Sequence, residues 1–379
     1  MKTSFYLLIV ALALLVSCNK DEDTILTDIT GNITTNTTWT SGNVYTLKSR
    51  VAIVSGVTLT IEPGVIIKGE FGTGSNATCL IVARGGRLIA EGTSSAPIIF
   101  TSVADEIMPG ELLSPNVDSA VNGLWGGLIV LGNAPISASS ASMQIEGIPA
   151  TDPNGLYGGA NAADNSGVIR YVSIRHGGAN IGEGNEINGL TLGGVGSGTT
   201  IDHIEIVSNQ DDGIEWFGGS VDVNDAIIWM AGDDAVDTDQ AWGGTLDNFV
   251  VISPGDECFE LDGGEGTTDA THIITNGSVW AGTAQGLLDM DADSYTDMNN
   301  IYFFGLTAGQ DVEDALPGTF SGSTWQVTLP ASTAVTDFFK LGTDAWTTSV
   351  AAGANTVGAD ISEFNGWTFS AAKGALADF

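Results

Sequence analysis

The amino-acid sequence predicts an all-β protein folded as a parallel β-helix, a solenoid in which each coil of the chain stacks on the one before it. Three observations support this prediction. The 379 residues include 51 Gly and only 10 Pro, and the charged fraction of 15% is low against the usual ~25%, which suits short strands and tight turns. Short alternating apolar runs recur between Gly, Asn and Asp. An acidic motif also repeats at a nearly constant interval.

The acidic motif gives the period of the solenoid. Residues 211–215 read Asp-Asp-Gly-Ile-Glu, residues 233–237 Asp-Asp-Ala-Val-Asp and residues 256–260 Asp-Glu-Cys-Phe-Glu, with a degenerate fourth copy at 286–289. Offsets of 22 and 23 residues are typical of solenoid repeats of roughly 20–25 residues. A β-propeller would need blades of ~40 residues. We therefore favour a β-helix, with adjacent coils ~4.8 Å apart.

The element boundaries follow from the same pattern. The β-helix is expected to occupy residues 39–310, with loops inserted at 102–124 and 138–166, where apolar runs are missing. Residues 311–379 are expected to form a C-terminal cap, because the last coil of a solenoid exposes strand edges. The expected strands are short, apolar and bounded by turn residues, and lie at 57–61, 80–83, 98–100, 128–131, 168–174, 201–207, 226–229, 248–252, 272–274 and 301–304.

The N-terminus has the features of a secretory signal. Residues 1–17 combine Lys2 with a short apolar run, which is too short to span a membrane. The run ends in Leu-Val-Ser-Cys and resembles the bacterial lipobox, in which Cys18 would carry the lipid. The alternative is an ordinary signal peptide with a chance cysteine. Residues 18–38 are expected to form an acidic and polar linker, and the cluster at 19–23 resembles the surface-export signal of Bacteroidota lipoproteins. This predicts an outer-membrane protein, lipid-anchored and facing the cell exterior.

Charge restricts the possible partners. The formal net charge is -35, and 28 acidic residues but no Lys or Arg lie between Arg175 and Lys340. Nucleic acid is excluded as a partner by repulsion, whereas divalent cations are favoured. We expect a monomer. Cys79 and Cys258 lie far apart in the chain and are expected to be buried free thiols.

Four segments of the sequence resemble those of a known family. Residues 124–136, 169–178, 188–196 and 211–219 resemble secreted and lipidated β-helix proteins of the Bacteroidota, a largely uncharacterised family. The resemblance covers residues 39–310. It implies a pectin-lyase-like, right-handed and single-stranded parallel β-helix, and it supplies no function, because one fold serves many functions.

Stacking of the repeats would align the acidic side chains in three columns. Carboxylates ~5 Å apart repel one another by roughly 3 kcal/mol at an effective dielectric of ~20. Hard cations such as calcium relieve this repulsion, because they prefer oxygen ligands. The alternative is a solvated acidic face with outward side chains. The predicted metal ligands belong to the four copies of the motif and are Asp211, Asp212, Glu215, Asp233, Asp234, Asp237, Asp256, Glu257, Glu260 and Asp289.

An enzyme is the alternative function. Paired carboxylates serve glycosidases, and the stretches at 209–213 and 176–178 loosely resemble polygalacturonase motifs. A polysaccharide lyase or glycoside hydrolase would then use Asp212, Glu215 and His176 as catalytic residues. However, no basic residue follows the acidic motif, which argues against recognition of a uronate.

Tryptophans suggest a role in binding. Trp216 and Trp242 lie beside acidic positions, and exposed indoles there would stack against sugar rings. We therefore expect a cell-surface lipoprotein with a non-catalytic role, either calcium-assisted binding of a glycan or another cell-surface component, or adhesion and scaffolding in the envelope.

Overall fold

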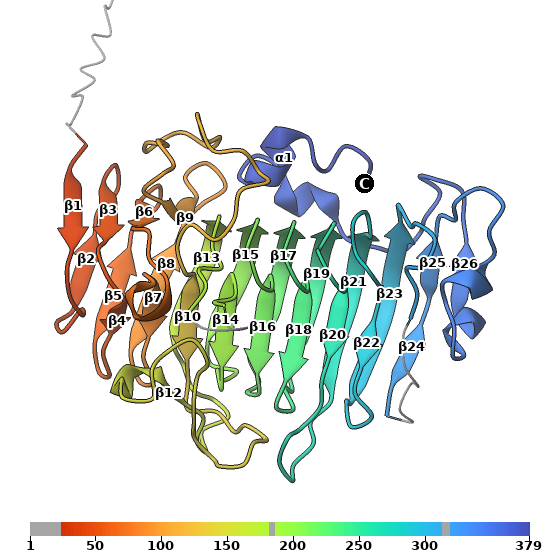
Figure 1. Cartoon of the computed structure of the whole chain (residues 1–379), viewed down its shortest axis with the longest axis horizontal. Coiled ribbons are helices and arrows are strands. Elements are labelled where there is room, and N and C mark those ends of the chain that lie inside the picture. Colours follow the sequence, from red (N-terminus) through yellow and green to blue (C-terminus); the bar gives the residue numbers. More distant parts are fainter. Residues whose placement is uncertain (1–23, 182–185, 313–318) are drawn as a thin grey trace, which may run out of the picture.

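The structure, a computed structural model, describes residues 24–181, 186–312 and 319–379. The chain folds as a right-handed parallel β-helix, so the predicted fold is confirmed. Figure 1 shows the coils side by side along the long axis, from the N-terminal strands to the C-terminal ones. The predicted signal peptide and Cys18 lie outside the described residues.

Two parallel sheets run along the solenoid. The larger has 16 strands: β1 (Leu26–Ile29), β2 (Thr37–Trp39), β3 (Val44–Leu47), β5 (Thr58–Ile61), β6 (Ile66–Gly69), β8 (Arg87–Glu91), β9 (Ile98–Ser102), β13 (Gly167–Arg175), β15 (Thr200–Val207), β17 (Val223–Trp229), β19 (Thr245–Ile252), β21 (His272–Trp280), β23 (Thr296–Phe304), β24 (Ser321–Ser323), β25 (Trp325–Val327) and β26 (Thr347–Ser349). The smaller has eight: β4 (Val51–Ile53), β7 (Leu80–Val82), β10 (Leu128–Leu131), β14 (Leu190–Gly193), β16 (Ile214–Phe217), β18 (Val236–Asp239), β20 (Phe259–Leu261) and β22 (Asp289–Met290).

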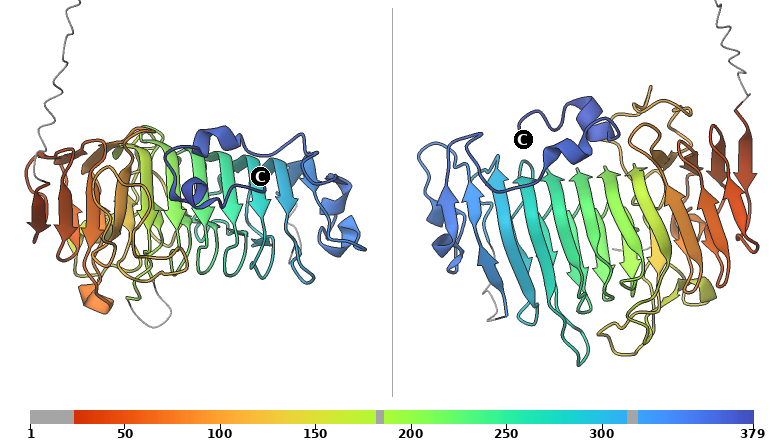
Figure 2. Two further views of the ribbon diagram at one scale, coloured as in Figure 1. Left: turned by 90° about the horizontal axis from the view of Figure 1, so that it is seen from above. Right: turned by 180° about the vertical axis from the view of Figure 1, so that it is seen from behind.

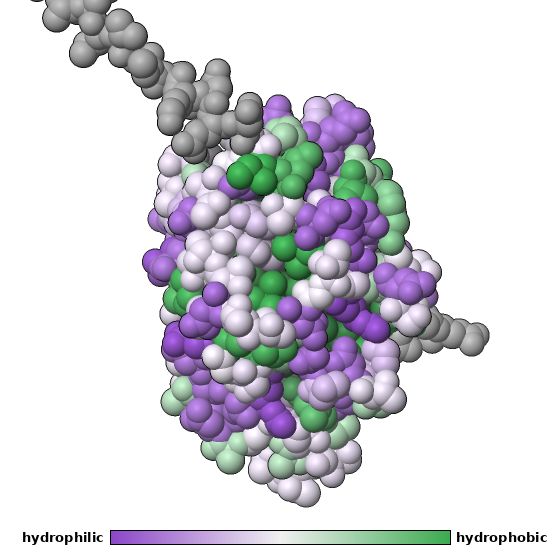
Figure 3. Space-filling model, turned by 90° about the vertical axis from the view of Figure 1, so that its left-hand side faces the viewer, coloured by the Kyte–Doolittle hydropathy of each residue, from purple (hydrophilic) through white to green (hydrophobic). Residues whose placement is uncertain are grey.

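The β-helix is longer than predicted at both ends. Strands β1 and β2 lie in the segment expected to be a linker, and β24, β25 and β26 continue the sheet beyond residue 310. The sequence did not reveal the first strands, because polar Thr and Asn side chains on their solvent-facing side interrupt the apolar pattern. Figure 3 views the molecule from this N-terminal side, and Leu26 of the edge strand β1 is 70% exposed. The predicted loops contain no coil strand beyond the end of β9, but they hold a small antiparallel pair, β11 (Met143–Gln144) and β12 (Leu156–Tyr157), and a short 3-10 helix at Pro153–Gly155.

A column of left-handed residues bends the larger sheet into two faces. One residue in each successive strand has φ between 48° and 58°, namely Tyr171, His203, Asp225, Asn248, Asn276 and Asn300. Asn and Asp tolerate this conformation better than most residues. Their side chains also bond between coils, since Asn248 Nδ2 donates to Asp225 Oδ1 at 2.6 Å and Asn300 Nδ2 to Asn276 Oδ1 at 3.1 Å. The repeated corner therefore keeps the coils in register.

The C-terminal region divides into two parts. Phe320, Phe339 and Trp346 pack around Trp325 at the last coils, as expected of a cap. The remaining chain, residues 350–379, instead returns along the side of the solenoid, and we call it the strap. Its helix α1 (Phe369–Lys373) lies over the strands from β13 onward (Figures 1 and 2). Cap and lateral strap are therefore separate structures.

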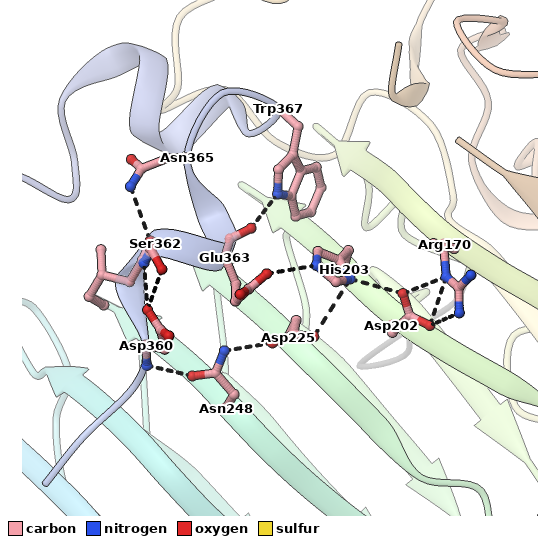
Figure 4. Close-up of polar contacts among 11 residues, drawn as sticks. Arg170, Asp202, His203, Asp225, Asn248, Asp360, Ser362, Glu363, Asn365 and Trp367 are labelled. Atoms are coloured by element: carbon pink, nitrogen blue, oxygen red, sulfur yellow. Dashed lines mark hydrogen bonds and ion pairs between the residues drawn. The ribbon is translucent and has the colours of Figure 1, made fainter. Parts of the chain in front are cut away.

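The strap docks on the corner column. Glu363 Oε2 lies 3.3 Å from His203 Nε2, and the backbone N–H of Asp360 donates to Asn248 Oδ1 at 2.6 Å (Figure 4). Beneath α1, the fully buried Glu205 accepts bonds from the backbone N–H groups of Phe369 and Ser370 at 3.0 and 2.8 Å. A buried carboxylate thus satisfies the N-terminal donors of this short helix.

Candidate functional site

One of the three acidic columns forms on the outer face of the smaller sheet. Successive residues of a strand point to opposite faces, so Ile214 and Trp216 enter the core while Glu215 points outward. Glu215 pairs in register with Asp237, Asp237 with Glu260, and Glu260 with Asp289. The predicted vertical stacking of these four side chains is confirmed.

The other two columns lie at the corner before these strands. Asp212 Oδ1 accepts the backbone N–H of Asp234 at 3.0 Å, and Asp234 Oδ1 accepts that of Glu257 at 2.6 Å. Each carboxylate therefore caps the turn of the following coil. Main-chain hydrogen bonds link the third column instead, because the N–H groups of Gly232 and Asp256 donate to the carbonyl oxygens of Asp211 and Asp233.

Five of the carboxylates form one compact cluster. Ligand oxygens of Asp212, Glu215 and Asp237 all lie within 4.8 Å of one another, as do those of Asp211, Asp212 and Asp233. Asp212 belongs to both sets. We call these five residues the carboxylate cluster; among the described residues, it brings the predicted ligands together most closely.

Burial distinguishes the cluster from an ordinary acidic surface. Asp212 and Glu215 are each 7% exposed and Asp237 is 9% exposed, whereas Asp211 is half-buried and Asp233 exposed. The alternative of a solvated face is therefore wrong for the buried members. The remaining predicted ligands differ: Asp234 is buried, and Asp256, Glu257, Glu260 and Asp289 are half-buried.

Protonation follows from this crowding. Burial raises the pKa of Glu215 well above its usual range, and the charges of Asp237 and Asp212 raise it further. Burial likewise raises the pKa of Asp212 and of Asp237. The pKa of Asp211 rises to about 7 through burial and the charges of Glu146 and Glu186. Without a cation, the cluster must hold protons at neutral pH.

A family comparison covers this whole region. A model described as a pectate-lyase-like β-helix domain matches residues 31–348. The chain belongs to this family. Membership in the pectate-lyase-like β-helix family suggests a glycan-related role without deciding between binding and catalysis. No curated protein and no solved structure matches the chain. Within the described residues, no helix is long and apolar enough to cross a membrane.

The oxygen atoms that the carboxylate cluster of this pectate-lyase-like β-helix offers as metal ligands suit a hard cation. The cluster offers carboxylate oxygens, and none of its members pairs with Lys, Arg or His in the part of the chain that the structure describes. Asn188 lies beside the cluster, because its Nδ2 contacts Glu215, and its buried Oδ1 has no hydrogen-bond partner among the described residues. Calcium accepts carboxylate and amide oxygens as ligands, so the residues present fit the predicted metal.

Sequence reasoning missed several acidic residues around the cluster. Glu146 and Glu186 approach it from outside the repeat. Asp239 and Asp262 continue the outward face two residues after Asp237 and Glu260, and with Asp291 they line a hollow of about 280 Å³. The period of two along each strand could have revealed the second pair, whereas Glu146 and Glu186 belong to irregular segments.

Two predicted functional assignments are wrong. Trp216 and Trp242 are fully buried and stack on each other with centroids 4.6 Å apart, so neither can bind a sugar from outside. The repeat places them inside the coil, next to outward acids. His176 is also fully buried; its Nδ1 lies 2.6 Å from the carbonyl oxygen of Val121. It occupies a left-handed corner with φ of 61° and cannot serve as a catalytic base.

Proposed function

We propose that this pectate-lyase-like β-helix is a non-catalytic, calcium-dependent glycan-binding protein of the cell surface. Its carboxylate cluster would hold calcium, and the acidic outer face would present the ion to the hydroxyl and carboxyl groups of a glycan. The lipobox-like sequence ending at Cys18 and the acidic residues after it support a lipid anchor in the outer membrane of a member of the Bacteroidota. A purely structural role as an adhesion or scaffold element uses the same anchor and the same ion.

One observation carries the calcium proposal. Three largely buried carboxyl groups, Asp212, Glu215 and Asp237, have oxygens within 4.8 Å of one another. At that distance a pair of charged carboxylates repels by about 3.5 kcal/mol at an effective dielectric of 20. A bound divalent cation converts this repulsion into attraction, and the more open Asp211 and Asp233 leave a route for the ion.

A specific observation favours the enzyme alternative and calls for a separate test. Glu215 contacts Asp237 and holds a raised pKa, as general acids of glycosidases do. Against catalysis, Glu215 and Asp212 are each only 7% exposed, and His176 is buried. Product release from polysaccharide panels, measured by reducing ends and by unsaturated-product absorbance, would establish an enzyme, and the absence of turnover in calcium supports binding alone.

Calcium binding is tested by calorimetric titration of the chelator-treated protein and by thermal melting. A ligand that binds only the folded state raises its stability by about 2.7 kcal/mol at 100 times Kd. The matched variants are Asp212→Asn, within the cluster, and Glu106→Gln, an exposed acid outside the cluster. Loss of calcium binding only in Asp212→Asn supports the proposal. Equal behaviour of the two variants, or no binding by the wild type, contradicts it.

Glycan binding is tested separately on a glycan array, with calcium and with chelator. Signals that appear only with calcium and vanish in Asp212→Asn support the proposed function. Signals that persist in chelator would place the glycan site elsewhere and contradict the role of the cluster in binding it.

A further inference from the structure

Arg50 differs from every other basic residue that the structure describes. Eight of the nine described Lys and Arg side chains contact a carboxylate, a carbonyl, another polar group or an aromatic ring: Lys48, Lys68, Arg84, Arg87, Arg170, Arg175, Lys340 and Lys373. The guanidinium of Arg50 has no such partner among the described residues, and its Nη1 atom is buried without a hydrogen bond.

An orphaned guanidinium is costly and calls for an explanation. A buried donor left unsatisfied costs about 1–3 kcal/mol, and more when it is charged. A shortage of acids is not the reason, because the chain has 46 Asp and Glu against 11 Lys and Arg. Ordered water, an ion or a ligand usually satisfies such a group when no side chain does so.

The surroundings of Arg50 form a small open hollow. It measures about 260 Å³, and Arg50 and Ser75 supply its polar donors while Ile148, Pro149 and Ile181 supply an apolar wall. Gly147 also lines it, with a left-handed φ of 73°. A Cβ atom there would lie 2.5 Å from the Ile181 side chain, so glycine lets the two walls approach. The hollow thus pairs a fixed positive group with a compact apolar surface.

The hollow is separate from the carboxylate cluster. Arg50 immediately precedes β4, whereas Asp212 precedes β16, and three strands of the same sheet lie between them. Four steps of ~4.8 Å place Arg50 roughly 19 Å from Asp212 along the solenoid. The segment that supplies Gly147 to the hollow also carries Glu146, however, and the charge of Glu146 acts on Asp211. The two sites have opposite charge, and one does not require the other.

We propose that this hollow is an oxyanion-binding site. The planar guanidinium of Arg50 would hold a carboxylate or sulfate group through paired hydrogen bonds, Ser75 would add a donor, and the apolar wall would contact the small organic group that bears the anion. The site requires no cation and stands independently of the calcium proposal.

Binding of two probes in chelator tests the proposal, with glucuronate for the carboxylate and glucose 6-sulfate for the sulfate, and glucose as the neutral control. We expect the wild type to bind at least one anionic probe and not glucose, and Arg50→Gln to bind it at least tenfold more weakly. The matched control Arg87→Gln removes an exposed arginine that contacts Asn165 and should bind like the wild type. Equal loss in both variants, or no binding of either anion by the wild type, overturns the proposal.

A second pair of variants keeps the test decisive if Arg50→Gln fails to fold. Ser75→Asp places a carboxylate in the exposed part of the hollow, where it would pair with Arg50, whereas Ser75→Asn is close in size and neutral. Ser75→Asp should abolish binding of the anionic probe and raise the melting temperature relative to Ser75→Asn. Undiminished binding in Ser75→Asp would show that Arg50 is not the anchor.

Discussion

Replacing Glu215 by Gln should change stability in opposite directions with and without calcium. Gln has the same shape but carries no charge, and its amide can donate to Asp237, with which Glu215 shares a hydrogen bond. In chelator at pH 8 the variant no longer needs to hold a proton or to tolerate two neighbouring charges. In calcium the same variant lacks one anionic ligand. A side chain with a merely structural role would not produce this reversal.

The distances give the size of both effects. One carboxylate pair within 4.8 Å contributes about 3.5 kcal/mol of repulsion at an effective dielectric of 20, and partial hydration reduces the expected gain in chelator to about 1–3 kcal/mol. Unfolding entropy of ~2.1 cal/mol/K per residue, over roughly 350 residues, converts this to about 1–4 °C. Wild-type protein at 100 times Kd should gain about 2.7 kcal/mol, or about 4 °C, and the variant much less.

Thermal melting in a two-by-two design measures the reversal. Wild type and Glu215→Gln are melted at pH 8 in chelator and in calcium, beside Glu106→Gln, whose exposed carboxylate lies outside the cluster. We expect Glu215→Gln to melt above wild type in chelator and to show a smaller calcium shift, with Glu106→Gln matching wild type in both. A variant that melts below wild type in chelator, or keeps the full calcium shift, would refute the reasoning.

Three further predictions follow from the same contacts. In chelator, the free energy of unfolding should fall as pH rises from about 4 to 7, by about 1.4 kcal/mol per pH unit for each carboxyl that keeps its proton only when folded. Asp211, with a pKa of about 7, is one such group. Urea melts at several pH values measure this slope, and calcium should flatten it. Glu205→Ala removes the carboxylate that faces the buried charge of Arg175 and accepts from the α1 donors, and it should cost about 3–5 kcal/mol. Glu363→Gln, at the half-exposed strap contact, should cost under about 1 kcal/mol. Equal losses in chemical denaturation would contradict this account of the strap. Trp216→Ala should cost about 3–5 kcal/mol without altering glycan affinity, and an unchanged fold with lost glycan binding would argue for an exposed indole.

The fold could be predicted because the sequence itself repeats an acidic motif at a nearly constant interval. Offsets of 22 and 23 residues between acidic motifs fix the coil length, and period-two alternation then fixes which side chains point outward. The stacking of Glu215, Asp237 and Glu260 follows from these two periods alone, and the structure confirms it. The first strand, β1, was not predicted, because a short strand with polar residues lacks a clear apolar pattern.

The environment of each residue could not be predicted in the same way. Trp216 and Glu215 are neighbours in sequence, yet one is core and the other faces outward, so proximity to acids did not indicate exposure of the indole. The charges of Glu146 and Glu186, which raise the pKa of Asp211, come from irregular segments outside the repeat. The return of the strap onto His203 is likewise a contact across 160 residues with no local signal.

The central claim is that the crowded carboxylates around Asp212 hold a cation. Diffraction from crystals grown in calcium, with anomalous data to identify the ion, tests it most directly. We predict an anomalous peak bounded by Asp212, Glu215 and Asp237, with oxygens at about 2.3–2.6 Å. Well-ordered carboxyl groups at saturating calcium with no peak between them would contradict the account.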